Sequence, residues 1–187
     1  MIGDCYDRSK LYVFGGRYYY EEYPISGCVE KIGDDDPRAT FSVVDGLMDG
    51  EYVEYYQNGR RMMSQEYSEG IKEGLYVYYR ENGSVSDSFY YVKDRPDGEI
   101  LGYFESGSER SWEYYEDGLS ERFSILFLDT SKSTYLWGGR VNGINKGDWY
   151  YKFENDSCFI RTYENNNEYY DTYCSCEEAL YPPIDEW

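Results

Sequence analysis

The sequence predicts an all-β protein made of tandem β-hairpins that repeat about every 24 residues. Three observations support this fold class: many strand-forming residues, glycines at a fixed interval, and short turn sequences between strand-like runs. Tyrosine occurs 26 times in 187 residues, and aromatic residues make up 20% of the chain. Aromatic and β-branched residues favour the pleated surface of a sheet, and such a content is not typical of disorder.

Glycines carry the repeat. Gly50, Gly74 and Gly98 lie 24 residues apart, and we call this position the anchor. Arg122 takes the next anchor position, and Gly147 follows after one inserted residue. The half-units that start at the anchors read GEYVEYYQNG, GLYVYYRENG, GEILGYFESG, RFSILFLDTS and GDWYYKFEND. A fixed period of this length indicates repeated structural units that stack on one another.

Each unit is predicted to be a β-hairpin. The tips are expected at Asn58-Gly59, Asn82-Gly83 and Ser106-Gly107. Asn-Gly between two strand-like runs favours a hairpin turn in which both turn residues have positive φ. A glycine-rich return such as 68–70 then leads to the next anchor.

Alternation along the strands predicts a core face and a mixed face. The positions three and five residues after each anchor are expected to form the core: Val53, Tyr55, Val77, Tyr79, Leu101, Tyr103, Ile125 and Phe127. The opposite face mixes aromatic and charged side chains, as binding surfaces often do. From it we predict these partner-binding residues: Tyr52, Glu54, Tyr56, Tyr76, Tyr78, Glu99 and Phe104. Ordinary cross-strand packing is the alternative explanation for these tyrosines.

Three regions are expected. Residues 1–45 form a divergent N-terminal β cap, residues 46–163 form the hairpin array, and residues 164–187 form an acidic C-terminal cap or tail. Repeat arrays need atypical units at their ends.

The half-units share the pattern G-x-[YW]-x-x-[YF]-[YF]-x-[NS]-G, which at this period resembles the MORN repeat. It is most similar to the bacterial variant in antitoxin-like and immunity-like proteins. The matching residues are Gly50, Tyr52, Tyr55, Tyr56, Asn58 and Gly59; Gly74, Tyr76, Tyr79, Asn82 and Gly83; Gly98, Tyr103, Phe104 and Gly107; and Gly147, Trp149, Phe153 and Asn155. The resemblance implies an elongated, twisted, single-layer antiparallel sheet that binds another protein. The fourth unit and residues 1–45 depart from the pattern.

Composition argues against catalysis. The chain has no histidine, which excludes Ser-His-Asp and Cys-His sites and removes the commonest metal ligand. It has no P-loop and no nucleophile elbow. Asp34-Asp35-Asp36 lacks the glycine and glutamate of a calcium loop, and Cys174 and Cys176 do not complete a zinc pattern. We expect no enzyme activity, no cofactor and no metal site, with a carbohydrate-binding or hydrolytic domain as a minor alternative.

The net charge of −19, from 37 acids and 18 bases, predicts a basic protein as the partner. It argues against direct binding of nucleic acid or anionic membranes. Three functions remain open. The first is a non-catalytic inhibitor of antitoxin or immunity type, which covers the working surface of a basic, nucleic-acid-handling target. The second is a phage or mobile-element inhibitor of a host defence enzyme that mimics nucleic acid. The third is a scaffold or a homodimer formed through sheet edges.

The five cysteines are irregularly spaced. No signal-peptide pattern is visible at the start of the sequence, and no stretch approaches the length of a transmembrane helix. We therefore expect a cytoplasmic protein whose cysteines are free thiols.

Overall fold

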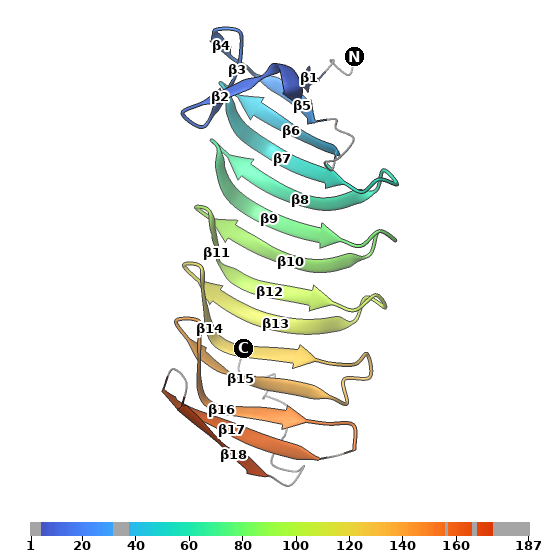
Figure 1. Cartoon of the computed structure of the whole chain (residues 1–187), viewed down its shortest axis with the longest axis vertical. Coiled ribbons are helices and arrows are strands. Elements are labelled where there is room, and N and C mark those ends of the chain that lie inside the picture. The colour runs from blue at the N-terminus through green and yellow to red at the C-terminus, as the bar shows by residue number, and fades with distance from the viewer. Residues whose placement is uncertain (1–4, 32–37, 156, 166–167, 174–187) are drawn as a thin grey trace. The chain divides into compact units, whose positions relative to one another are not determined.

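The computed structural model describes residues 5–31, 38–155, 157–165 and 168–173. Most of these residues form strands, and they include no α-helix and one short 3₁₀ turn, η1 (Arg8–Lys10) (Figure 1). No helix among them is long and apolar enough to cross a membrane. Consecutive strands form antiparallel hairpins, so the predicted all-β hairpin repeat is confirmed. The chain divides into two compact units, residues 1–96 and 97–187.

Unit 1 contains a sheet in the order β1-β5-β6-β7-β8-β9-β10, with β11 paired to β10. Among the described strands of this unit, only β1 and β5 form a parallel pair. A separate three-stranded sheet is formed by β2, β3 and β4. The strands are β1 (Tyr6–Asp7), β2 (Tyr12–Phe14), β3 (Arg17–Tyr20), β4 (Tyr23–Pro24), β5 (Gly27–Lys31), β6 (Arg38–Val44), β7 (Leu47–Tyr55), β8 (Arg61–Ser68), β9 (Ile71–Tyr79), β10 (Val85–Val92) and β11 (Arg95–Pro96). We call residues 8–25, which hold η1 and β2–β4, the lobe.

The described residues of unit 2 form seven strands that pair in chain order, and every pair is antiparallel. The strands are β12 (Gly98–Tyr103), β13 (Glu109–Glu116), β14 (Leu119–Phe127), β15 (Tyr135–Val141), β16 (Ile144–Lys152), β17 (Cys158–Asn165) and β18 (Glu168–Tyr173).

The hairpin tips differ from the predicted turn. Tyr56 N–H donates to the Arg60 carbonyl (2.9 Å) and Gly59 N–H donates to the Tyr56 carbonyl (2.9 Å). Gly59 has φ +81°, but Asn58 does not have positive φ. The tip is therefore a type I turn followed by a left-handed glycine, and the expectation of positive φ at both residues is wrong. The Asn58 side chain is the physical reason, because its Oδ1 accepts the Arg60 N–H (2.9 Å), a local bond typical of asparagine in turns.

The return turns hold the pairs of positive φ instead. At Glu69-Gly70 the φ angles are +50° and +84°. The same left-handed pair occurs at 45–46, 93–94, 117–118 and 142–143. Two consecutive left-handed residues match the right-handed twist of the strands they join.

In four return turns, the N–H of the first turn residue donates a hydrogen bond to a carboxylate of the preceding unit. The carboxylate belongs to the residue directly before an anchor. The bonds run from Glu69 N to Asp49 Oδ2 (3.1 Å), Lys93 N to Glu73 Oε2 (2.9 Å), Asp117 N to Asp97 Oδ2 (3.2 Å) and Asn142 N to Glu121 Oε1 (2.6 Å). These four acids therefore serve the architecture, and their period of 24 or so residues was a signal that the sequence analysis did not use.

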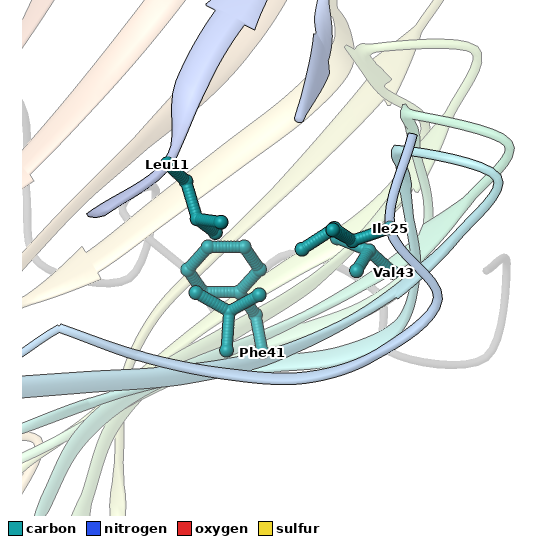
Figure 2. Packing of buried hydrophobic residues seen from close by; sticks show 5 residues of the cluster. Leu11, Ile25, Phe41 and Val43 are labelled. Carbon is teal, nitrogen blue, oxygen red and sulfur yellow. The ribbon is translucent and has the colours of Figure 1, made fainter. Parts of the chain in front are cut away.

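The main hydrophobic cluster lies where the lobe packs on the sheet of unit 1. Leu11 and Ile25 of the lobe meet Val29, Phe41 and Val43 of β5 and β6. Figure 2 shows Leu11 next to the Phe41 ring, with Ile25 beside Val43. Tyr18, Met48 and Tyr52 pack against this cluster.

Of the expected core residues, Val53, Val77 and Phe127 are buried. The core of unit 1 is nevertheless not confined to the expected face, because the lobe covers the other face at Tyr52.

The prediction of free thiols is wrong for three cysteines. Cys5 and Cys28 form a disulfide, with Cα atoms 4.6 Å apart, and Cys158 is also disulfide-bonded. The physical reason is the parallel pairing of β1 with β5, which sets Tyr6 opposite Val29 and so brings the two preceding residues together. Cys174, Cys176, Asp34, Asp35 and Asp36 lie outside the described residues.

Candidate protein-binding face

One face of the unit 1 sheet carries an aromatic row. Register pairs each member with the next across five strands, from β6 to β10. The row is Phe41, Tyr52, Gln65, Tyr76 and Phe89. Ring centroids are 5.7 Å apart for Phe41 and Tyr52 and 4.5 Å apart for Tyr76 and Phe89. We call this side of the sheet the aromatic face.

A second row on the aromatic face is more polar. It lies two residues along each strand from the first row, so alternation places it on the same side. Its members across β7 to β10 are Glu54, Met63, Tyr78 and Asp87. All four are half-buried. The face therefore combines rings, a thioether and carboxylates.

The carboxylates on this face are close enough to the tyrosines to change the pKa of their hydroxyl groups. Tyr52 donates its hydroxyl to Glu54 Oε1 (2.7 Å). Burial and this bond together raise the pKa of Tyr52 well above its ordinary value. Burial also raises the pKa of Tyr76, and the charges of Glu54 and Asp87 add to that rise. Tyr52 and Tyr76 are thus neutral hydrogen-bonding groups at physiological pH, set beside negative charge.

Four predicted binding residues lie together on this face, namely Tyr52, Glu54, Tyr76 and Tyr78. Tyr56 lies at the hairpin tip, where its hydroxyl donates to the Tyr79 carbonyl (2.6 Å) of the next hairpin. A side-chain hydrogen bond with Tyr78 raises the pKa of Tyr56 to about 12. Tyr56 thus joins successive tips.

The other two predicted residues are in unit 2. Glu99 is an exposed residue of β12, and Phe104 directly follows that strand. Because they are five residues apart along one extended segment, they point to opposite sides of it. They do not belong to the aromatic face of unit 1.

Sequence reasoning missed the contributions of the second strand in each hairpin. Phe89 and Tyr91 of β10 contact each other, with centroids 5.3 Å apart, and Tyr67 of β8 contacts Tyr52 edge-on at 6.2 Å. The signal was present, because positions 41, 65 and 89 and positions 43, 67 and 91 are each related by the 24-residue period. Alternation within the strands that directly follow the anchors does not reach these residues, because they belong to the returning strands.

Gln65 interrupts the aromatic row. Its side chain is 1% exposed, and its Nε2 donates to the Glu66 carbonyl (2.7 Å). Its Oε1 is buried and has no hydrogen-bond partner among the described residues. Gln65 therefore carries a cost in stability at a position where Phe41 and Phe89 stand in the neighbouring periods.

The described residues contain no group of three or more side chains that could hold a metal ion. Comparison with protein-family models and with curated proteins finds no match. The MORN resemblance therefore rests on the repeat pattern, and the function must be argued from the face itself.

Proposed function

We propose that this chain is a non-catalytic inhibitor of antitoxin or immunity type, which binds a basic target protein and covers its working surface. The observation that supports this is the aromatic face of unit 1, where Tyr76 and Phe89 lie in one row and Glu54 and Tyr78 lie in the next. Tyrosine supplies large contact area with few rotatable bonds, and aromatic residues are enriched in interface cores. Carboxylates beside the rings favour a cationic partner.

The charge of the chain supports the same partner. A net charge of −19 raises the rate of encounter with a basic protein, and that rate falls as salt increases. A target that handles nucleic acid has a basic groove, which acidic and aromatic side chains can occupy. The nucleic-acid-mimic version of this inhibitor shares the physics, and no observation favours it over the first.

The test is capture of partners by the tagged chain from its native host, with low-salt and high-salt washes. Tyr76→Ala removes a ring from the aromatic face. Tyr90→Ala is the matched control, because Tyr90 is 54% exposed on the opposite face of β10. We expect the wild type and Tyr90→Ala to retain one basic protein at low salt and Tyr76→Ala to lose it. Equal capture by all three proteins would exclude the aromatic face as the binding surface. Thermal melts check that both variants fold.

The cysteines support a proposal about the compartment in which the chain acts. Disulfides form and persist in oxidising compartments, and Cys5, Cys28 and Cys158 are all disulfide-bonded. In place of the cytoplasmic expectation, which assumed free thiols, we propose that the inhibitor acts in an oxidising compartment. Labelling of free thiols in protein taken directly from the host tests this proposal, since a cytoplasmic protein would react at Cys5 and Cys28.

One observation favours homodimerisation as a second candidate. Strand β18 ends the sheet path of unit 2, and no described strand pairs with its outer edge. All six of its residues are exposed, and Tyr173 is 91% exposed. Exposed edges can pair with another chain. Sedimentation over a range of concentrations tests this candidate, and a monomer at the highest concentration would remove it.

A further inference from the structure

The lobe of unit 1 and strand β1 just before it expose a group of large hydrophobic side chains. Six occur within residues 6–23, and Phe14 and Tyr23 are the most exposed at 75% and 73%. The others are Tyr6, Tyr12, Val13 and Tyr20. Tyr12 stacks on Tyr19 with centroids 5.3 Å apart. Exposed apolar patches on soluble proteins mark interaction sites.

The sheet holds this surface in place. Tyr18 N–H donates to the Gly46 carbonyl (2.7 Å), and Arg17 Nη1 donates to the Asp45 carbonyl (2.5 Å). The Cys5–Cys28 disulfide fixes the chain just before the lobe to β5. A surface fixed before binding loses little conformational freedom when a partner docks.

The turn between β3 and β4 adds charge to the aromatic surface. Tyr20 pairs with Tyr23 across the turn. Glu21 and Glu22 lie between them, and both are exposed. Within the part of the chain that the structure describes, neither carboxylate has a salt bridge or side-chain hydrogen bond. The tip therefore presents two rings and two carboxylates, with no ion pair to a cation from the described residues.

The same combination of groups holds arginine elsewhere in the protein. Arg161 Cζ lies 4.1 Å from the centroid of the Tyr169 ring, and Arg161 Nε donates to Asp171 Oδ1 (2.7 Å). Arg38 likewise lies over Tyr55 at 5.5 Å. A guanidinium group stacks on an aromatic ring and donates to a carboxylate at the same time. Arg38 Nε also donates to Glu30 Oε1 (2.8 Å), so in both places one arginine contacts a tyrosine ring and a carboxylate of the chain.

We propose that the Tyr20–Tyr23 tip is a docking site for an arginine side chain of a basic partner protein. The rings receive the face of the guanidinium group, and Glu21 and Glu22 accept its N–H groups. The Tyr6 ring, whose centroid lies 6.3 Å from that of Tyr20, is covered by the rest of the partner's surface. Phe14 pairs with Arg17 at the other end of β3 and lies outside this site. This inference shares with the proposed function only the expectation of a basic partner, and it concerns a surface outside the aromatic face.

The probe is a twelve-residue peptide of alternating arginine and glycine, titrated into the full-length chain at low salt by calorimetry. Matched lysine–glycine and glutamate–glycine peptides show whether the guanidinium group matters. We expect the arginine peptide to bind most tightly and the glutamate peptide not to bind. Tyr23→Ala and the double variant E21Q/E22Q should each weaken binding of the arginine peptide about three- to fivefold.

Two controls separate the tip from general attraction to an acidic chain. The double variant E69Q/E81Q removes the same charge from exposed positions of unit 1, and Tyr90→Ala removes an exposed ring that lies outside both proposed surfaces; both should leave peptide binding unchanged. Equal weakening by E69Q/E81Q and E21Q/E22Q would overturn the proposal in favour of general attraction. Self-association in sedimentation that Phe14→Ser abolishes would overturn it in favour of a second copy as the occupant.

Discussion

Two return turns of the protein have the same backbone conformation and different surroundings. The φ angles are +48° and +79° at Asp45-Gly46, and +52° and +76° at Asn142-Gly143. A Cβ at Gly46 would lie 2.8 Å from the Tyr18 carbonyl oxygen of the lobe, whereas a Cβ at Gly143 would meet nothing within 4 Å. The repeat therefore specifies the turn, and the lobe then uses the first turn as its docking point.

Gly46→Ala is expected to have the largest effect on stability, because it adds a Cβ at the turn on which the lobe docks. The overlap is with backbone, so no rotamer change relieves it, and the lobe must shift away from the turn. The loss of packing by Leu11 and Ile25 adds to the cost of positive φ, and we expect about 4 kcal/mol of destabilisation. Gly143→Ala is the matched control, with about 1 kcal/mol from backbone strain alone. Urea unfolding measures both, and equal effects would show that the lobe does not dock on the turn.

The next largest effect comes from the second attachment of the lobe, the Cys5–Cys28 disulfide. The two cysteines are 23 residues apart in sequence. Replacing both with serine should cost about 3 kcal/mol, because the unfolded chain regains the freedom that a loop of this length loses on closure. Substitution is preferable to a reducing agent, which would also act on the disulfide of Cys158. An unchanged unfolding midpoint would mean that the Cys5–Cys28 bond contributes no net stability.

The regular hairpins were predictable and the lobe was not. In the repeats, turn glycines, strand-forming residues and period all indicate the same structure, so local and global signals agree. The lobe has no second copy in the chain, and its contacts with Gly46 and Phe41 join residues distant in sequence. The disulfide could not be predicted because it requires β1 to pair in parallel with β5. Strand β1 has two residues, too few to show an alternating pattern in the sequence.

The candidate face was predicted in part, for a related reason. Tyr52, Glu54, Tyr76 and Tyr78 follow from alternation within single strands. Their neighbours in the second strands, such as Phe89, require the register between strands. That register contains bulges, for example between Val85 and Asp87, and simple counting along the sequence does not locate them.

Gln65 lies on the aromatic face, and replacing it should change stability less than the two preceding changes and in the opposite direction. Gln65 is buried with an unpaired Oε1, at the position that Phe41 and Phe89 occupy in the neighbouring periods. Gln65→Leu removes the unpaired oxygen while nearly conserving volume, so we expect stabilisation of about 1 kcal/mol. The control is Gln57→Leu at an exposed hairpin tip, which should change stability little. Clear destabilisation by Gln65→Leu would show that the amide contributes net stability, through its bond to the Glu66 carbonyl or through a partner of Oε1.

The smallest effect concerns unit 2, where an arginine already lies between a tyrosine and a carboxylate as we propose for the lobe tip. The hydrogen bond from Arg161 lowers the pKa of Asp171 below its ordinary value of 3.8. A carboxyl group with a lowered pKa in the folded state stabilises the protein above its unfolded pKa, and this stabilisation is lost as the pH falls through the folded pKa. Unfolding measured from pH 6 to pH 2 should therefore show a steeper acid loss in the wild type than in Asp171→Asn. The effect is small because both side chains are partly exposed. Identical pH profiles would mean that Tyr169 and Asp171 do not hold Arg161 in solution. They would also weaken the case that the Tyr20–Tyr23 tip binds an arginine in the same way.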